Sequence, residues 1–414
     1  MSSDRRKRFG AYLARLRRAT GRRQRQLADR LCALSGLDSV TRHEISRWER
    51  GARVPDSWLA MLAEALGVSA SELERAAAYA RRETDTAPPG PAATLAELLP
   101  VGDPLVPIAA QPGRRIGAEA VNRLAARVHG LRLADDVLAG GDLIAPAFRE
   151  LGAAVRLYRE SGHSEEVGRA LLTQIGELAQ IAGWIASDAG QYAQAERAYT
   201  VGISAAQQAG DRPLVGHLAG SLAYQLSNTG REREGIDLAR AALADAGPDA
   251  PAKARALFFD RVAWGHARAG EAQPAMRALG EAHDALSVEG ADDAPLWAYW
   301  VSREELEVMD ARVFTELRRP LRAVPLLTDV LTRYDATHAR EVALYRSWLA
   351  VAYADANEPE RAAQEARHVI TTTAEVASER IAERSRIVLR RLLPFGDVPE
   401  VRSLLDDHAN LTAG

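Results

Sequence analysis

The side chains best suited to chemistry lie in one short arginine-rich stretch, TRHEISRWERG at residues 41–51. Thr41 followed three residues later by Glu44 is the capping pattern that begins a helix. Ile45 and Trp48 lie one turn apart on the inner face of this helix. The outer face then carries four basic or polar side chains, namely Arg42, His43, Ser46 and Arg47. A short helix fits the major groove of B-DNA, where its N-terminal residues reach base edges, so the stretch predicts contact with DNA.

The charge of the chain is divided between two parts of opposite sign. Residues 1–82 contain 18 Arg and Lys and nine Asp and Glu, a net charge of +9, whereas the remaining residues carry a net charge of −12. A basic head of this kind indicates a polyanionic partner, and the acidic body indicates a different task. Charge alone does not decide the matter, because a basic tail that only aids solubility has the same sign.

Composition excludes several classes of protein. Of the 414 residues, 47% are hydrophobic and 26% are charged, which is typical of a globular protein of roughly two to four domains. Cys32 is the only cysteine, so neither a disulfide framework nor a cysteine-based metal cluster is expected. No apolar run is long enough to span a bilayer, and the start, MSSDRRKRFG, carries charge where a secretion signal would need an apolar stretch. We therefore expect a soluble cytoplasmic protein with no membrane partner.

Glycine and proline divide the chain into three segments. Residues 1–82 are expected to form one domain of five helices, at 4–19, 24–34, 42–49, 57–66 and 70–80. Residues 83–115 contain seven prolines and are expected to be a linker, because proline lacks an amide donor and disfavours helix in the residue before it. Residues 116–414 return to helical periodicity. No segment is typical of a β-sheet, so the predicted fold class is all-α.

The third segment repeats with a period of 40 residues. Glycine recurs at Gly190, Gly230 and Gly270, and an aromatic residue recurs at Trp184, Tyr224 and Trp264. Small residues form two further columns with the same period, Ala195, Gly235 and Ala275, and Gly183, Ala223 and Ala263. The pattern predicts two packed helices joined by a tight turn at glycine, with small residues where the backbones approach. One such pair cannot bury its own apolar face, so the pairs are expected to stack into a solenoid.

The head resembles the Cro/C1-type (XRE) helix-turn-helix family over residues 9–67. The matching motifs are FGAYLARLRRATG at 9–21, QRQLADRL at 24–31, TRHEISRWERG at 41–51, VP at 54–55 and LAMLAEALGV at 59–68. The resemblance implies that base edges are read by Arg42, His43 and Arg47. It implies that phosphates are contacted by Arg22, Arg23, Gln24, Ser46, Arg50 and Arg53. It also implies a structural ion pair between Arg17 and Glu49.

Two features depart from the family pattern. Leu27 and Trp48 are 21 positions apart, which is more than in compact members of the family. The extra residues, 33–40, enlarge the turn before the third helix, where they contact DNA, pack elsewhere or tilt that helix. In addition, no Ser, Thr or Asp precedes Gln24 to cap the second helix. An alternative interpretation of the head is a helix-turn-helix kept only as an assembly module.

The body resembles tetratricopeptide repeats, most closely at GQYAQAERAY, residues 190–199. Its 40-residue period is longer than the usual ~34 residues, which implies longer helices. Two further pairs are expected at 304–333 and 343–371, where Arg318 and Asn357 replace the turn glycine. The complete prediction is an N-terminal helix-turn-helix domain, a Pro-rich linker and an α-solenoid of tetratricopeptide-like pairs.

By this resemblance the first helix of each pair lines a concave groove. The candidate groove residues are Gln180, Trp184, Asp188, His217, Tyr224, Asn228, Asp260, Trp264, Arg268 and Arg312, with Glu305 and Glu316 continuing the surface. Aromatic, amide and charged groups in alternation suit a signalling peptide, as in the quorum receptors that this layout resembles. Actinobacterial regulators with the same two parts resemble the chain equally well without an obvious ligand. Two alternatives are that the aromatics only fill gaps between helices, or that the body serves as a dimerisation surface.

Catalysis has little support in the sequence. The nine histidines are scattered, and we find no HExxH pattern, phosphate-binding glycine loop or GxSxG turn. No enzyme activity, metal or cofactor is therefore expected. The predicted function is a homodimeric, sequence-specific transcriptional regulator of double-stranded DNA whose body senses a peptide, small ligand or protein partner. The alternatives are a repeat-type adaptor for protein–protein interaction and an antitoxin-like autoregulator.

Overall fold

A computed structural model describes residues 2–20, 22–36, 39–68, 70–84, 115–137, 140–287, 294–333, 339–375 and 378–409. Within these ranges the chain is all-α, as predicted, and has no β-strand; a single isolated bridge joins Arg115 and Gly162. The predicted linker, residues 83–115, lies outside the described residues except at 83–84 and 115. The chain divides into two compact units, Met1–Ala93 and Thr94–Gly414, called here the head and the repeat domain.

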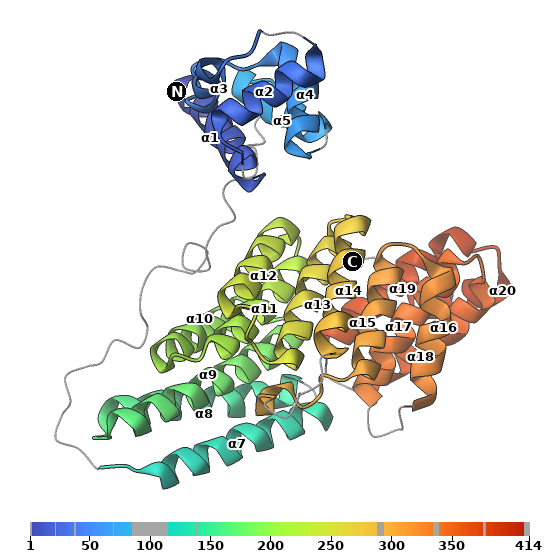
Figure 1. The fold of residues 1–414 in the computed structure, drawn as a ribbon. Helices are drawn as coiled ribbons and strands as arrows, with labels where there is room; N and C mark the ends of the chain where they lie inside the picture. The colour runs from blue at the N-terminus through green and yellow to red at the C-terminus, as the bar shows by residue number, and fades with distance from the viewer. Residues whose placement is uncertain are drawn as a thin grey trace. The chain divides into compact units, whose positions relative to one another are not determined.

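The head contains the five predicted helices (Figure 1). They are α1 (Ser2–Ala19), α2 (Gln24–Ser35), α3 (Arg42–Glu49), α4 (Leu59–Leu66) and α5 (Ala70–Arg81), with a short 3-10 turn, η1 (Asp56–Trp58), before α4. The core is made of apolar side chains that recur at helical spacing and are fully buried: Phe9, Leu13, Leu27, Leu31, Ile45, Leu62 and Leu73. Because each helix supplies one apolar face, α1 packs on α3 and α5, and α2 packs on α3 and α4.

Local hydrogen bonds fix where α2 and α3 begin. The predicted cap of α3 is present, because the Thr41 side chain accepts a hydrogen bond from the Glu44 N–H at 3.4 Å. At α2, where no conventional cap precedes Gln24, the Gln26 side chain accepts the N–H of Arg23 at 2.8 Å. A free N–H at the start of α2 is thus satisfied from inside the helix.

The enlarged turn between α2 and α3 packs partly into the head itself. Helix α2 continues to Ser35, and Gly36 then ends it with a left-handed φ of +68°. After residues 37–38, which lie outside the described ranges, Val40 is buried in the core of the head. The Cys32 thiol donates to the Val40 carbonyl at 3.3 Å. The described part of the insertion therefore supports the start of α3.

Helices α1 and α3 cross in close contact at Gly10. A β-carbon on Gly10 would lie 2.4 Å from the carbonyl oxygen of Glu49, 2.6 Å from the nitrogen of Gly51 and 2.7 Å from the carbonyl oxygen of Trp48. All three are backbone atoms at the C-terminal end of α3. Only glycine allows this approach, because even one methyl group would overlap the backbone.

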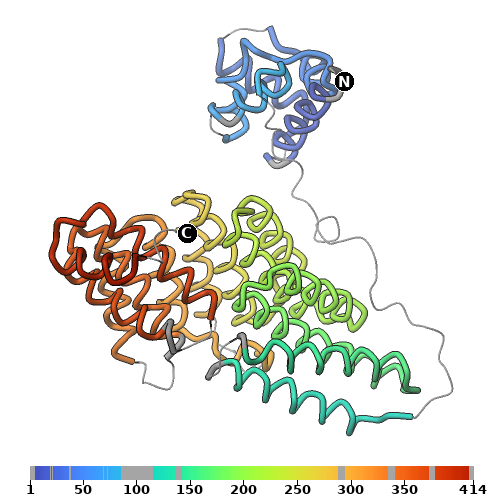
Figure 2. The backbone as a smooth tube through the Cα atoms, turned by 180° about the vertical axis from the view of Figure 1, so that it is seen from behind, coloured from blue at the N-terminus to red at the C-terminus, as the bar shows by residue number. Residues whose placement is uncertain are grey.

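The repeat domain is a stack of antiparallel helix pairs, seen from two sides in Figures 1 and 2. Its pairs are α9 (Glu165–Asp188) with α10 (Tyr192–Ala209), α11 (Arg212–Asn228) with α12 (Glu232–Ala246), α13 (Ala252–Arg268) with α14 (Ala272–Ser287), α15 (Arg303–Glu316) with α16 (Pro320–Arg333), and α17 (Ala339–Asp355) with α18 (Pro359–Glu375). Helices α7 (Ala118–Val137) and α8 (Gly140–Glu160) precede the pairs. Helix α19 (Glu379–Leu392), the turn η5 (Leu393–Phe395) and α20 (Pro399–Asp407) follow them, and η3 (Leu296–Ala298) lies between α14 and α15.

The turn and small-residue columns take the positions predicted for them. Gly190, Gly230 and Gly270 have φ values of +74°, +82° and +73°. Arg318 and Asn357 replace them in the later pairs with φ values of +53° and +61°, a conformation that costs a non-glycine residue free energy. The small residues of the two columns are all buried: Gly183, Ala195, Ala223, Gly235, Ala263 and Ala275. A β-carbon on Gly183 would overlap the Tyr199 ring of α10, and one on Gly235 would overlap α11 at Ser227.

The repeat domain curls until the first of the five pairs contacts the helix that follows the last pair. The Ser378 hydroxyl, which caps α19, donates to a carboxylate oxygen of Asp188 at the end of α9, at 3.0 Å. Arg380 also lies 3.9 Å from the Asp188 carboxylate. These contacts join residues 190 positions apart, so the first helices of the pairs surround an inner space. None of the helices in the described ranges has an apolar stretch that could cross a membrane.

Candidate functional site

Helix α3 presents its basic face away from the core of the head. Ile45 and Trp48 are buried, as predicted, while Arg42, His43 and Arg47 are exposed and Ser46 is half-buried. One guanidinium nitrogen of Arg47 lies 3.1 Å from the Glu44 carboxylate one turn earlier. Three side chains that could contact base edges are thus presented together on a rigid helix.

The side chains predicted to contact phosphates lie around α2 and the end of α3. Arg23, Arg50 and Arg53 are exposed, whereas Arg22 and Gln24 are half-buried. Arg22 donates to the Ala65 carbonyl at 3.3 Å, and Arg50 donates to the Ser46 carbonyl at 3.2 Å. Arg50 and Arg53 come just after the end of α3, a position suited to contacts with phosphates that would fix the position of a duplex.

A buried ion pair holds α3 against α1 and α2. The Glu49 carboxylate accepts hydrogen bonds from Nε of Arg17 at 2.6 Å and from Nη2 of Arg17 at 3.2 Å. It also accepts a bond from the Gln24 amide at 2.6 Å. The Arg17 and Glu49 side chains are only 11% and 7% exposed. The pair therefore fixes the angle at which α3 leaves the core.

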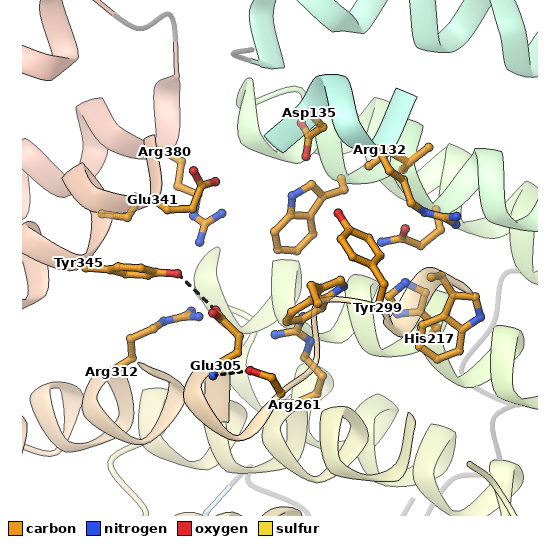
Figure 3. Close-up of a pocket in the computed structure, with 17 residues that line it drawn as sticks. Arg132, Asp135, His217, Arg261, Tyr299, Glu305, Arg312, Glu341, Tyr345 and Arg380 are labelled. Atoms are coloured by element: carbon orange, nitrogen blue, oxygen red, sulfur yellow. Dashed lines mark hydrogen bonds between the residues drawn. The ribbon is translucent and has the colours of Figure 1, made fainter. Parts of the chain in front are cut away.

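A cavity of about 370 Å³ opens on the inner face of the repeat domain (Figure 3). Its walls come from α7, from the η3 segment and from the first helices of the pairs, together with α19; no second helix of a pair contributes among the described residues. In Figure 3 the side chains of Arg312, Tyr345 and Arg380 extend from α15, α17 and α19 toward the same space. A second cavity of about 150 Å³ lies beside it, and Trp184 lines both; we call these two the large cavity and the small cavity.

The predicted groove residues are distributed over these two cavities. The large cavity is lined by Gln180, Trp184, His217 and Arg312, and also by Glu305. The small cavity is lined by Trp184, Asp188, Tyr224, Asn228, Trp264 and Arg268, and also by Glu316. Asp260 lines neither and is buried against Arg261 at 3.2 Å. Nine of the ten candidate groove residues thus line one of these two cavities.

The aromatic residues of the 40-residue period form a continuous ladder. The ring centroids of Trp184 and Tyr224 are 5.7 Å apart, and those of Tyr224 and Trp264 are 5.8 Å apart. Trp348 continues the ladder with an edge contact to Trp264 at 6.4 Å. Tyr224, Trp264 and Trp348 are buried, whereas Trp184 is half-buried and faces both cavities. The three buried rings therefore pack between helices, and Trp184 keeps an accessible surface.

Arginine side chains lie against the faces of these rings. The Arg312 guanidinium lies 4.4 Å from the Trp348 centroid and 4.6 Å from the Trp264 centroid, and it donates to the Tyr224 hydroxyl at 2.5 Å. Arg380 lies 5.4 Å from the centroid of Trp184. Cations are attracted to aromatic faces, and more strongly where water is excluded. The ladder therefore retains positive charge inside the domain.

The positive charge of these arginines changes the pKa of Tyr224. Burial by itself raises the pKa of the Tyr224 phenol, and Asp260 raises it further. The guanidinium groups of Arg312, Arg380 and Arg261 outweigh both effects and lower the pKa to about 8. The nearby cations thus stabilise the charged phenolate more than the neutral phenol.

We therefore expect Tyr224 to ionise at a lower pH than an ordinary tyrosine, whose pKa is about 10. Ultraviolet difference spectroscopy should show one tyrosinate forming near pH 8, absent in Tyr224→Phe and moved to higher pH in Arg312→Gln. Because the folded pKa is below the unfolded value of about 10, this group adds stability that is fully present above about pH 10 and is lost as the pH falls through 8. A single tyrosine transition near pH 10 in the wild type would contradict the assignment.

Several cavity residues do not belong to the repeating columns. The η3 segment supplies Trp297, Tyr299 and Trp300, and α7 supplies Arg132 and Asp135. Because they do not follow the 40-residue period, the repeat pattern does not predict them as cavity residues. The aromatic cluster at 297–300 is nevertheless visible in the sequence.

One η3 tryptophan packs on a predicted groove residue. Trp297 stacks on His217 with a centroid distance of 4.1 Å and an interplanar angle of 6°. Burial, together with the nearby Arg132 and Arg261, lowers the pKa of His217 well below its usual value. His217 is therefore a neutral part of the cavity wall.

Among the described residues, no group of three or more His, Cys, Asp and Glu side chains has the arrangement needed to hold a metal ion. A family model described as a helix-turn-helix domain matches residues 8–76, which covers α3 and its buried support. No curated protein is significantly similar to the chain. The head is a helix-turn-helix domain, and it supports a DNA-binding regulator at this general level.

Proposed function

We propose that the protein is a sequence-specific transcriptional regulator of the XRE type, acting in the cytoplasm and without enzyme activity. The head binds double-stranded DNA with α3 in the major groove. Arg42, His43 and Arg47 read base edges, and the surrounding arginines contact phosphates. The exposed basic face of α3 within a helix-turn-helix domain is the observation that supports this proposal.

The repeat domain, which we assign to the tetratricopeptide type, takes the sensing role. Its inner cavity brings together side chains from α7 to α19, so a bound molecule would contact most of the stack at once. We further propose that the protein acts as a homodimer. Two α3 helices related by a two-fold axis would then reach half-sites one DNA turn apart, roughly 34 Å, on a near-palindrome.

Two arginine substitutions test the proposed roles. Arg47→Ala should weaken binding to the specific site by ~1–3 kcal/mol and relax selectivity at one base position. Arg53→Ala, at an equally exposed position outside α3, should weaken all sequences alike and lower the salt slope by ~1. Binding to a specific duplex and to a scrambled duplex, measured over a salt series, distinguishes the two effects. Wild-type binding by both variants would show that α3 is not the recognition helix.

A further inference from the structure

Two arginines on the wall of the large cavity have buried nitrogen atoms without acceptors. Arg312 is only 7% exposed, and its Nε has no hydrogen-bond partner. Arg132 is 6% exposed; one of its nitrogens donates to Glu177 at 2.8 Å, but its Nη2 has no partner. Leaving a charged donor buried without an acceptor costs free energy that an anionic ligand would recover.

Arg312 differs from the other buried arginines in its counter-charge. Arg132 pairs with Glu177, and Arg261 pairs with Asp260. Among the described residues no carboxylate lies within ion-pair distance of Arg312, whose single hydrogen-bond acceptor is the phenol oxygen of Tyr224. A guanidinium offers two parallel donors to a carboxylate. Arg312 is thus the position in the cavity where a carboxylate would gain most.

The remaining wall suits a flat apolar group. Trp184 and Trp300 are half-buried and line the cavity, and Tyr299 is 42% exposed beside them. Ile181 and Leu344 add aliphatic surface. Aromatic rings pack on one another in offset or edge contacts, which are worth more than area burial alone. A planar aromatic ring is therefore the shape that these walls favour.

An extended peptide fits the cavity less well. Its backbone would need free amide groups, but the Gln180 amide donates to the Ser221 hydroxyl at 3.2 Å. In the neighbouring small cavity the Asn228 side chain is engaged in the same way, because it donates to the Tyr224 carbonyl at 2.9 Å and accepts from the Trp264 indole at 3.2 Å. The volume of about 370 Å³ is near the lower end of the range for small-molecule sites.

We propose that the large cavity binds a small planar aromatic carboxylate, with its acid group at Arg312 and its ring against Trp184 and Trp300. This inference rests on the proposed sensing role of the repeat domain and names the class of its ligand.

The test uses the full-length protein and calorimetry with 2-naphthoate, its neutral isostere 2-naphthamide and a pool of random heptapeptides. The wild type should bind the acid at least about tenfold more tightly than the amide, since a hydrogen bond to a charged group is the stronger. Arg312→Gln should weaken 2-naphthoate by about 10- to 100-fold and leave 2-naphthamide unchanged. Arg333→Gln is the matched control, because Arg333 is an arginine of the outer helix α16 and lines neither of the two cavities.

The outcomes separate this inference from the proposed regulator. If thermal melting shows that Arg312→Gln is unfolded, Arg312→Lys decides, since it keeps the charge but lacks the fork and should also weaken the acid. Equal binding of acid and amide, no binding of the acid, or tighter binding of heptapeptides would overturn the ligand class while leaving DNA recognition intact. If the wild type binds 2-naphthoate as predicted but binds no specific DNA, the proposed regulator function is wrong and the proposed ligand class stands.

Discussion

Replacing Glu49 with alanine is expected to destabilise the head by about 3–5 kcal/mol, because a buried ion pair that loses one partner leaves an uncompensated charge. The Glu49 carboxylate accepts hydrogen bonds from both Arg17 and Gln24, and among the described residues neither donor reaches a second carboxylate. Hydrogen–deuterium exchange of the full-length chain, followed on peptides from α2 and α3, measures this loss locally. Peptides from the repeat domain should keep wild-type protection.

The chain provides a matched control for this substitution. Glu44 also pairs with an arginine of the head, Arg47 at 3.1 Å, but the two side chains are 29% and 54% exposed. The Thr41 cap uses only the backbone N–H of Glu44, which alanine retains, and exposed pairs contribute about 0–1 kcal/mol. Glu44→Ala should therefore change protection little. Similar losses in Glu44→Ala and Glu49→Ala would show that burial of the Arg17–Glu49 pair does not determine its contribution.

Gly10→Ala is expected to cost about 3 kcal/mol, the upper end of the range for overpacking. Its β-carbon would meet backbone atoms of Trp48, Glu49 and Gly51 at 2.4–2.7 Å, and backbone cannot rotate away as a side chain can. Helix α1 must therefore move off the end of α3. Differential scanning calorimetry of the full-length chain should show the transition of the head at a lower temperature, with reduced affinity for DNA.

Gly130→Ala tests the same chemical change where space is free. Gly130 lies in the middle of α7, and a β-carbon there would meet nothing within 4 Å. Removing the flexibility of a helical glycine should then stabilise the repeat domain by roughly 0.5–1 kcal/mol. The two substitutions are expected to have opposite signs. A destabilising effect at Gly130 as large as that at Gly10 would show that the close approach is not the cause.

The helices of the head were predictable because their signals are local. The Thr41–Glu44 pattern fixes the start of α3, and the apolar spacing of Ile45 and Trp48 fixes its inner face. The same holds for the 40-residue period, in which Gly190, Gly230 and Gly270 mark turns that need a residue with a positive φ. Arg318 and Asn357 were identified as their replacements by position alone. Short-range patterns of this kind do not depend on the rest of the fold.

The remainder of the cavity depends on contacts that no local pattern encodes. Arg318 comes 48 positions after Gly270 instead of 40, and this longer interval includes the η3 segment that brings Trp297 and Trp300 to the wall. The contact between Asp188 and Ser378 joins the end of α9 to the start of α19, and it follows from the accumulated curvature of every pair. Periodicity identifies which helices face inward but not how far the stack curls.

The central proposal, recognition of specific DNA by α3, is tested most directly by selection of genomic DNA fragments with the purified full-length protein. The selection is made at near-physiological salt with Arg47→Ala in parallel, and it is repeated with residues 1–84 alone. We predict a short recurring near-palindrome that the wild type enriches and Arg47→Ala does not. Enrichment of the same fragments by both proteins, or no enriched motif with either the full chain or the isolated head, would contradict the proposal.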